Sequence, residues 1–365
     1  MRGLDPGFWS NKTVLITGHT GFKGTWMTVL LNSLGAKIHG FALEPNTSPN
    51  IFEVAKAEGL CQSHKFSDIS NMKSLSDTFK NANPDIMIHM AAQPIVSKSY
   101  LDPRKTFETN VMGTVNFLEC TRMVGRGVAL VISSDKCYLN TNEGKDFSET
   151  DPLGGFDPYS ASKAGTEVAV TSWRASFFGG QKLPVKLASA RAGNVIGGGD
   201  WSQDRLLPDI ARSLSENIPL NVRNPNATRP WQHVLEPVVA YLYLIQNMWE
   251  RDDLSEPFNI GPIPPKVQTV AEVFDCFVKH WPDKYLNLPS PKRSKIFEEA
   301  KKLSIDSNKI KRKLNWRPVL NFHEAVEWSA EWYGTYYKNG EESARILQIR
   351  QIEKYLERFN SKIRR

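Results

Sequence analysis

Short apolar runs alternate with amphipathic stretches over the first half of the chain. The run Thr13 to Thr17 is β-branched and leads into glycines, and Thr25 to Leu34 then has apolar positions at helical spacing. The same order of strand and helix is repeated further on. The other expected strands are Lys37 to Ala42, Asp85 to Met90, Val128 to Ser133 and Val185 to Arg191, and the other expected helices are Met72 to Asn81, Lys105 to Val124 and Tyr159 to Ser176. Strands separated by helices predict an α/β fold with a parallel sheet that carries helices on both faces.

The regular alternation ends after Arg191. Beyond it lie glycine- and proline-rich turns, short apolar runs, a helix around Val238 to Glu250 and an amphipathic segment, Phe322 to Tyr337, without an internal repeat. We therefore expect a doubly wound Rossmann domain over residues 1–187, to which 235–254 return, and a smaller C-terminal substrate-binding lobe from 188–234 and 255–365.

Composition is that of an ordinary globular protein, because 40% of the 365 residues are hydrophobic and 23% are charged. The formal net charge is +7, and much of the excess lies in Lys292 to Lys313 and in Lys362 to Arg365. Only Phe297 lies among the charges of the first stretch. Because strand-binding grooves need several aromatic rings, we expect a charged surface and no nucleic-acid partner.

Four cysteines show neither a C-x-x-C pair nor a histidine at zinc spacing. This pattern suggests no metal site and no disulfide framework, and it fits a reducing compartment. The chain also contains no apolar run of signal-peptide or membrane-spanning length. The sequence therefore predicts a cytoplasmic protein with no membrane association.

Glycines follow the first strand at the spacing G-x-x-G-x-x-G, as Gly18, Gly21 and Gly24. Glycines between a strand and a helix let the backbone turn tightly and approach a pyrophosphate, whose charge is met by amide donors and the helix dipole. By themselves they also fit a plain turn, but their place at the first strand of a wound sheet favours dinucleotide binding. After the second strand, Glu44 is a candidate for a ribose hydroxyl or a plain surface carboxylate. No arginine follows that strand to bind a 2′-phosphate, so NAD is favoured over NADP.

Two further groups of residues suggest acid–base chemistry. Tyr159 and Lys163 lie one helical turn apart, and a lysine ammonium beside a phenol, with a cationic nicotinamide, lowers the pKa of the phenol from about 10 so that it can act as a base. Ser134, Asp135 and Lys136 follow a buried strand, at the edge where wound sheets bind ligands. The carboxylate and ammonium there also fit a solvated pair in a turn.

The motifs together resemble a known family. TGHTGFKG at 17–24, Asp68-Ile69, HMAAQP at 89–94, NVMGT at 110–114, SSDK at 133–136 and DPYSASK at 157–163 occur in the order and spacing of the extended short-chain dehydrogenases/reductases, the NAD-dependent epimerase/dehydratase family. RAGNVIGGGDW at 191–201, Asp204-Arg205 and RPWQHVLEP at 229–237 are similar to the CDP-glucose 4,6-dehydratases among them.

This resemblance implies a set of ligand-binding residues. The cofactor would be NAD, and the residues that would bind it are Gly18, Thr20, Gly21, Phe22, Lys23, Gly24, Asp68, Ala91, Ala92, Gln93, Asn110, Tyr159 and Lys163. A nucleotide sugar would be held by Asn194, Arg205, Arg229 and His233. For the two arginines, ordinary surface or inter-lobe pairing is the other interpretation.

The resemblance also implies the reaction. A hydro-lyase would convert CDP-D-glucose to CDP-4-keto-6-deoxy-D-glucose by oxidation at carbon 4, elimination of water across carbons 5 and 6, and hydride return to carbon 6. Tyr159, Lys163 and Ser134 would serve the 4-hydroxyl, Asp135 would be the acid and Lys136 its basic partner. The alternatives are a related dehydratase or epimerase acting on another nucleotide or sugar, and a catalytically idle dinucleotide binder.

Assembly and pathway follow from the same resemblance. Members of the family form homodimers or homotetramers through two long helices, here Lys105 to Val124 and Tyr159 to Ser176, and usually supply deoxysugars for lipopolysaccharide. The chain departs from the CDP-glucose pattern in the polar stretch Leu139 to Phe147 and in Asn226-Ala227-Thr228, both next to the expected sugar and nucleotide sites. The reaction type is therefore better specified than the sugar.

Overall fold

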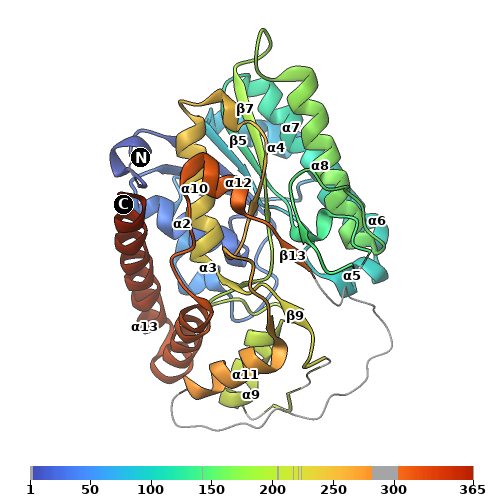
Figure 1. The fold of residues 1–365 in the computed structure, drawn as a ribbon. Coiled ribbons are helices and arrows are strands. Elements are labelled where there is room, and N and C mark those ends of the chain that lie inside the picture. The colour runs from blue at the N-terminus through green and yellow to red at the C-terminus, as the bar shows by residue number, and fades with distance from the viewer. Residues whose placement is uncertain are drawn as a thin grey trace.

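The computed structural model describes residues 3–141, 143–203, 205–216, 218–220, 222, 224–281 and 303–364 (Figure 1). Within these ranges, the main sheet has seven strands in the order β11-β7-β5-β4-β1-β2-β3, and every neighbouring pair is parallel. The strands are β1 Thr13–Thr17, β2 Lys37–Ala42, β3 Ser63–Phe66, β4 Ile86–His89, β5 Gly127–Ile132, β7 Val185–Ala192 and β11 Pro257–Ile260. This order confirms the doubly wound parallel sheet.

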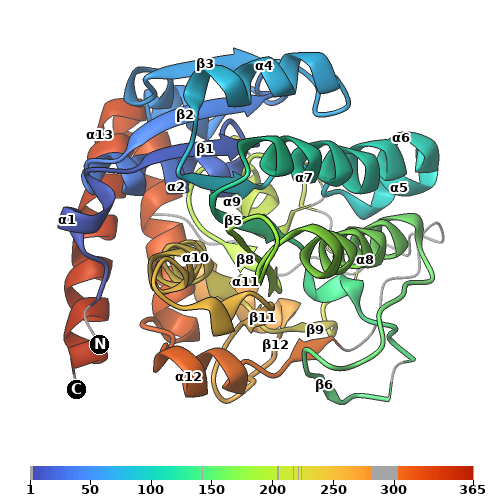
Figure 2. The same cartoon turned by 90° about the horizontal axis from the view of Figure 1, so that it is seen from above.

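Helices cover both faces of the sheet because successive strand side chains point to opposite sides. Val14 and Ile16 of β1 join one core cluster, whereas Leu15 joins the other. On the first face lie α2 Phe22–Ser33, α10 Leu235–Met248 and α13 Phe322–Arg364, and on the second lie α4 Met72–Ala82, α7 Gly113–Val124 and α8 Pro158–Phe177 (Figure 2). The helix expected around Val238 does pack on the sheet domain, where α10 contacts α2 and β5.

The expected helix Lys105 to Val124 is interrupted. It consists of α6 Pro103–Phe107, a π-helical turn at Glu108–Met112 and α7. Such single-turn π segments insert an extra residue into a helix and often occur at functional sites. Here the turn carries Asn110, which is buried.

The expected domain boundary needs one correction. We expected residues 255–365 in the second lobe, but β11 within this range is an edge strand of the main sheet, parallel to β7 from Pro257 opposite Ser189 to Ile260 opposite Ala192. The chain therefore returns to the sheet twice after β7, once as α10 and once as β11.

The second lobe consists of short elements laid beyond the carboxyl ends of the strands (Figure 1). Its helices are α9 Leu206–Glu216 and α11 Val270–Lys279, whereas α12 Asn308–Leu314 lies beside α10 and packs against β11 (Figure 1). Its two-stranded pairs are β8 Val195–Ile196 with β10 Gln232–His233, β9 Thr228–Arg229 with β12 Gln268–Thr269, and β6 Asp146–Phe147 with β13 Ser304–Ile305. The remaining short helices are α1 Pro6–Trp9, α3 Ile51–Val54, α5 Val96–Leu101 and the 3-10 turns Ala57–Leu60, Asp135–Cys137 and Asp252–Leu254.

The last helix, α13, ties the molecule together. It begins at Phe322, as expected, but extends past Tyr337 to Arg364 with a break at Gly340, whose φ is 82°. Its end packs against the start of the chain, because the Leu4 amide donates to Asn360 Oδ1 at 3.1 Å.

A buried carboxylate joins α13 to α10. Glu236 is 1% exposed, and it accepts hydrogen bonds from the amides of Val319 and Leu320 and, at 2.6 Å, from the hydroxyl of Tyr355. Burial raises the pKa of Glu236 to about 7 despite these donors. Three segments of the chain thus meet at one side chain.

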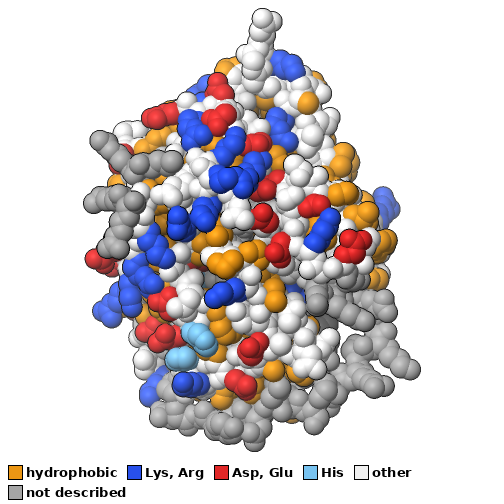
Figure 3. Space-filling model, viewed as in Figure 1, with side chains coloured by type: hydrophobic (Ala, Val, Ile, Leu, Met, Phe, Trp, Pro, Cys, Tyr) orange, Lys and Arg blue, Asp and Glu red, His pale blue; other side chains and the backbone are white. Residues whose placement is uncertain are grey.

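The surface around α12 mixes the two signs of charge. Figure 3 shows Lys and Arg side chains interspersed with Asp and Glu over this face. Lys309 and Lys313 of α12 pair with Glu256 at 2.6 and 2.7 Å. Of the basic stretch Lys292 to Lys313, residues 292–302 lie outside the described residues.

Two observations bear on metals and membranes. Within the described ranges, no cluster of three or more histidines, cysteines and carboxylates could hold a metal ion, and all four cysteines are free thiols. A search of the same ranges finds no helix with the length and apolarity needed to cross a bilayer.

Candidate active site

The glycine loop follows β1 and ends at the first turn of α2. Gly18 has φ 80°, and a Cβ there would lie 2.7 Å from the Ala91 amide nitrogen. A Cβ on Gly24 would lie 2.1 Å from the Gly18 carbonyl oxygen, so close backbone packing requires glycine at both positions. Gly21 precedes α2 without a side-chain cap, which leaves the amides of the first helical turn available to an anion. The loop therefore fits a dinucleotide pyrophosphate.

Buried polar contacts hold this loop against the end of β4. Thr17 Oγ1 lies 2.7 Å from His89 Nδ1, and the other ring nitrogen of His89 lies 3.1 Å from Thr114 Oγ1. Burial lowers the pKa of His89 to about 3, so the ring is neutral at pH 7. Thr20 reaches the end of β2 by donating to the Leu43 carbonyl at 2.9 Å.

The ends of β2 and β3, which lie on one side of β1, carry two further candidate cofactor residues. Asp68 accepts two hydrogen bonds from Ser70, both at 2.8 Å, and pairs with Lys105 at 3.1 Å. These contacts lower the pKa of Asp68 although partial burial opposes them, so it is a carboxylate. Glu44 is exposed at the end of β2.

The π turn supports the loop that follows β4. Asn110 accepts from the Gln93 amide at 2.8 Å and donates to Ser162 Oγ at 2.9 Å. The side chain of Gln93 donates to Thr106 and accepts from the Ile95 amide. The side chains of Asn110 and Gln93 thus form hydrogen bonds within the protein and fix the backbone of the loop that starts with Ala91 and Ala92. A ligand would therefore contact the backbone of this loop.

Helix α8 places Tyr159 and Lys163 beside this loop, at 7% and 5% exposure. Burial raises the pKa of Tyr159 to about 12, while the Ser134 hydroxyl and the charge of Arg205 act in the opposite direction. Burial, and then the like charge of Lys23, lowers the pKa of Lys163 to about 8. Two ammonium groups near each other make the space between them attractive to an anion.

The turn after β5 holds the third group. Ser134 donates to Asp135 Oδ1 at 3.0 Å and accepts from the Lys136 amide at 3.2 Å. Asp135 is 2% exposed, and its second oxygen, Oδ2, has no hydrogen-bond partner among the described residues. Burial raises the pKa of Asp135, although Lys136, Ser134, Arg229 and Lys23 act to lower it.

Residues of the second lobe close over these groups. The charges of Arg205 and Asp135 both act on Lys23, and burial lowers the pKa of Lys23 to about 8. Arg205 also donates to the Pro94 carbonyl at 3.4 Å, and Arg229 is 4% exposed in β9. Asn194 is half-buried at the turn before β8. The structure therefore brings together Ser134, Asp135, Tyr159, Lys23, Arg205 and Arg229.

His233 is not brought to this group. It is fully buried, and its ring makes edge-on contacts with Trp26 and Trp328 at centroid distances of 5.7 and 5.8 Å. Burial lowers its pKa to about 3. The expectation that His233 binds substrate is corrected to a role in packing, because two tryptophans enclose the ring.

A separate cavity of about 930 Å³ lies between α11 and the start of α13. Its lining includes Trp231 and Gln232, but not Ser134, Asp135 or Tyr159, and it carries both acidic and basic side chains. We place the candidate site at the sheet edge because the buried groups with perturbed pKa values converge there.

A buried ion pair that the sequence does not predict lies beneath the site. Arg191 Nη2 and Glu167 Oε2 are 2.8 Å apart, at 3% and 1% side-chain exposure. In the sequence, Glu167 lies one turn after Lys163 and Arg191 lies near the end of a predicted strand, but nothing in the sequence relates one to the other.

Comparison with known proteins identifies the family of this chain. The family model described as GDP-mannose 4,6 dehydratase matches residues 15–328. The chain is 40% identical to the CDP-glucose 4,6-dehydratase of Salmonella typhimurium over 97% of its own length and 98% of that protein's.

Solved structures show how widely the fold is shared. A dTDP-glucose 4,6-dehydratase from Streptomyces venezuelae, with NAD and TYD bound, matches with a TM-score of 0.75 at 20% identity, covering 89% of this chain and 97% of that one. A UDP-glucose 4-epimerase from Thermotoga maritima with UDP-glucose matches with a TM-score of 0.74 at 20% identity, covering 88% and 98%. The fold alone therefore does not separate dehydratase from epimerase. The extent of the family match and the identity to the Salmonella protein show that this chain belongs to the GDP-mannose 4,6-dehydratase family and is a homologue of CDP-glucose 4,6-dehydratase.

Proposed function

We propose that this chain is a hydro-lyase that converts CDP-D-glucose to CDP-4-keto-6-deoxy-D-glucose. The observation that carries the proposal is Asp135, a buried carboxyl whose Oδ2 has no partner among the described residues and whose pKa burial raises. A raised pKa favours the protonated form, which is the form a carboxyl group needs to give a proton to a departing hydroxyl. A 4-epimerase expels no hydroxyl and has no need of this acid. The 40% identity to a CDP-glucose 4,6-dehydratase points to the same reaction and nucleotide.

NAD is the cofactor that the site fits. Gly18, Gly21 and Gly24 leave room for its pyrophosphate, and Asp68 lies at the strand end where an adenine edge would be bound. The remaining residues proposed to hold it are Thr20, Phe22, Lys23, Ala91, Ala92, Gln93, Asn110, Tyr159 and Lys163. When bound, NAD accepts hydride from carbon 4 of the sugar and returns it to carbon 6.

Tyr159 acts on the 4-hydroxyl of the sugar. Its pKa of about 12 is too high for a base at neutral pH, so the phenol needs added positive charge nearby. Lys163, one turn away on α8, supplies part of that charge, and the Ser134 hydroxyl stabilises the phenolate. Tyr159 then removes the proton of the 4-hydroxyl as that carbon is oxidised.

Asp135 and Lys136 carry out the elimination. Once carbon 4 is a ketone, the hydrogen on carbon 5 becomes acidic, and Lys136 removes it directly or through a water. Asp135 protonates the 6-hydroxyl as it leaves. The residues differ in environment as the two roles require, because Asp135 is buried while Lys136 is only half-buried.

The diphosphate of the substrate is assigned to Arg205, Arg229 and Asn194. Arginine suits bidentate phosphate contacts, and the charges of both arginines already act on catalytic side chains, Arg205 on Tyr159 and Arg229 on Asp135. A diphosphate bound there would lie close to Lys23 and Arg205, whose like charges act on one another.

Self-association and location complete the proposal. Helices α5 and α8 and the π turn expose large apolar side chains, including Leu101 at 80%, Met112 at 52% and Val168 at 60%. We infer that these faces of α5, the π turn and α8 pair in a homodimer, which can pair again into a homotetramer, because exposed apolar surface of this kind marks protein interfaces. The expected cytoplasmic location is likewise a proposal.

The test is a substrate panel. Purified protein is incubated separately with CDP-, UDP-, dTDP- and GDP-hexoses, and loss of water is followed by mass with the alkaline absorbance of the 4-keto-6-deoxy product. Product from CDP-glucose is the expected result. Dehydration of another nucleotide sugar alone would move the assignment to that substrate, and interconversion without loss of water would make the chain an epimerase.

A further inference from the structure

A chain of buried side chains begins on the helix that carries Tyr159 and Lys163. Glu167 lies one turn further along α8, where its Oε2 accepts hydrogen bonds from Arg191 Nη2 and from Ser189 Oγ, both at 2.8 Å. Burying two charges costs free energy that their attraction only partly returns, so an ion pair at this depth is weak evidence for stability. The ion pair has a second property, because it links α8 to other segments around the site.

Arg191 connects α8 to the turn that bears the acid. Its Nη1 donates to the Tyr138 hydroxyl at 2.8 Å, and that hydroxyl donates to Asn259 Oδ1 at 2.6 Å. The ring of Tyr138 is stacked on Phe147 with the centroids 5.0 Å apart and the planes at 6°. Tyr138 directly follows the turn Asp135–Cys137, so these contacts fix one end of that turn.

Asn259 anchors the far end of the chain on β11. Its Nδ2 donates to the Phe147 carbonyl at 2.8 Å and to the Asp306 carbonyl at 3.1 Å, and its amide donates to Glu149 Oε1 at 2.8 Å. In the sheet it lies opposite Arg191 of β7. Every polar group of its side chain is therefore used to hold Tyr138 and the segments around it.

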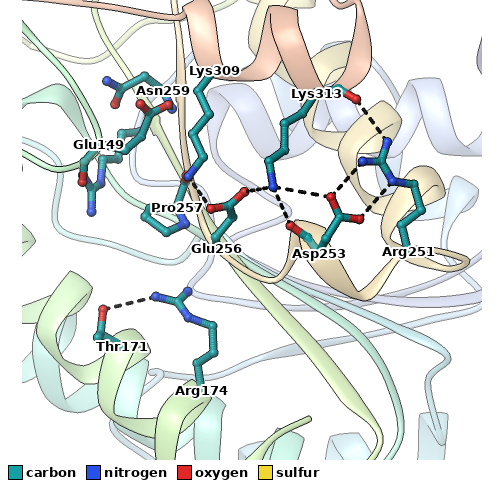
Figure 4. A network of polar contacts seen from close by, with 11 residues as sticks. Glu149, Thr171, Arg174, Arg251, Asp253, Glu256, Pro257, Asn259, Lys309 and Lys313 are labelled. Carbon is teal, nitrogen blue, oxygen red and sulfur yellow. Dashed lines mark hydrogen bonds and ion pairs between the residues drawn. The ribbon is translucent and has the colours of Figure 1, made fainter. Parts of the chain in front are cut away.

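The strand itself is clamped from outside. Lys309 and Lys313 of α12 both pair with Glu256, the residue before β11, and Lys309 also donates to the Pro257 carbonyl at 2.9 Å (Figure 4). Figure 4 also shows Glu149 and Asn259 close to this cluster. The surface cluster of opposite charges thus immobilises the strand on which Tyr138 depends.

We propose that Glu167, Arg191, Tyr138 and Asn259 are positioning residues that set the Asp135–Lys136 turn relative to Tyr159 and Lys163, and that Tyr138 serves the elimination rather than the oxidation. Tyr159 and Lys163 lie on α8, which Glu167 and Arg191 hold even when Tyr138 has no hydroxyl. Asp135 and Lys136 lie on the turn that the hydroxyl of Tyr138 fixes. This inference rests on the proposed function for its chemistry, though not for its geometry.

Tyr138→Phe tests the proposal by removing one oxygen atom. Because a shift of the acid by about 1 Å costs on the order of 100-fold, we expect dehydration to slow by roughly 10- to 100-fold with KM little changed. Oxidation at carbon 4 continues, so reduced cofactor accumulates during turnover and its near-ultraviolet absorbance rises above that of the unsubstituted protein. Arg191→Lys keeps a cation for Glu167 but removes the Nη1 donor to the Tyr138 hydroxyl, so it is expected to give the same accumulation.

The matched control is Tyr355→Phe. It also removes a buried hydroxyl that donates at 2.6 Å, here to Glu236, far along the chain from the site. We expect it to lower the unfolding temperature without raising the fraction of reduced cofactor. A stability loss with unchanged partitioning in Tyr138→Phe as well would reduce the role of the chain to a structural one.

Amide hydrogen exchange without substrate separates the geometry from the chemistry. Peptides spanning residues 134–138 are expected to exchange faster in Tyr138→Phe and at the original rate in Tyr355→Phe. If the unsubstituted protein dehydrates no nucleotide sugar, the proposed function is wrong. The exchange result still shows whether the Tyr138 hydroxyl fixes the turn at residues 134–138. Unchanged exchange in Tyr138→Phe would overturn the inference even in an active enzyme.

Discussion

A methyl group at Gly21 distinguishes a loop built for a ligand from a loop that only turns. A Cβ there would meet nothing closer than the Gly18 carbonyl oxygen at 3.5 Å, an ordinary contact, and its φ is −74°. The protein alone should accept Gly21→Ala. A Cβ on Gly24 would instead lie 2.1 Å from the same oxygen and 2.9 Å from the Gly18 carbonyl carbon, so Gly24→Ala has to push backbone aside.

The magnitudes follow from these distances. Overpacking of this kind costs about 1–3 kcal/mol, whereas exchanging glycine for alanine at a helix N-cap costs a few tenths to about 1 kcal/mol. At roughly 2.1 cal/mol/K per residue, a chain of 365 residues loses about 1 °C of unfolding temperature per 0.8 kcal/mol. Gly24→Ala should therefore melt about 1–4 °C lower, and Gly21→Ala within about 1 °C of the original protein.

Gly21→Ala, which should barely change stability, should nevertheless weaken cofactor binding. Gly21 lies at the N-terminus of α2, where a pyrophosphate would approach the backbone, so its methyl should weaken NAD binding at least about tenfold, or about 1.4 kcal/mol. Calorimetric titration of NAD into stripped protein measures this, and a thermal scan of the same sample measures stability. If Gly21→Ala bound NAD as tightly as the unsubstituted protein, no phosphate would approach this turn, and the assignment of the loop to the cofactor would be wrong.

Three further predictions concern buried titratable groups. Asp135→Asn keeps the shape of the acid but not its proton, so dehydration should fall about 10²- to 10⁴-fold and reduced cofactor should accumulate. Because burial raises the pKa of Asp135, the rate of the original enzyme should decline as pH rises through that pKa. This decline should be missing from the pH–rate profile of the variant. Lys163 has a folded pKa of about 8 against 10.5 unfolded, so its ammonium lowers stability fully below pH 8, and this cost decreases as pH rises to 10.5. Urea unfolding should show Lys163→Met about 2–3 kcal/mol more stable than the original at pH 7 and less than about 1 kcal/mol more stable at pH 10. An equal difference at both pH values would contradict a buried cation. His233 has a pKa of about 3, so it takes up a proton only when the protein unfolds, and the original protein loses up to about 1.4 kcal/mol of stability for each pH unit below 6.5. His233→Phe should abolish this loss. Parallel plots of stability against pH for the two proteins would argue against a neutral core histidine.

The strands and helices that the sequence predicted best are those buried on a regular period. β1 and β2 have the predicted bounds, because β-branched and apolar residues fill a strand covered on both faces. Strand β3 carries Ser63, His64 and Lys65 at the edge of the sheet, and its composition gives no strand signal. Strand β11 is four residues long, and its place beside β7 is decided by the packing of residues distant in sequence.

The candidate site was predictable to a similar degree. Tyr159, Lys163 and the glycine loop are local motifs, and the edge of the sheet that collects Asp135 follows from the topology. His233 was misassigned because a histidine in a motif and a histidine between two tryptophans look alike in sequence. The partnership of Glu167 and Arg191 could not be found, since nothing local relates a residue of α8 to one of β7.

The contacts of Glu236 also bear on how the protein is made. Its carboxylate is satisfied by Val319 and Leu320, which are translated 83 and 84 residues later, and by Tyr355, which is translated 119 residues later. At roughly 5–20 residues per second, the ribosome adds that interval in about 6 to 24 seconds. During this time α10 is complete but holds a carboxyl group whose partners do not yet exist. The core between α10 and α13 therefore closes only after Tyr355 has been made, and a chain interrupted before that residue leaves the apolar face of α10 uncovered for chaperones to bind.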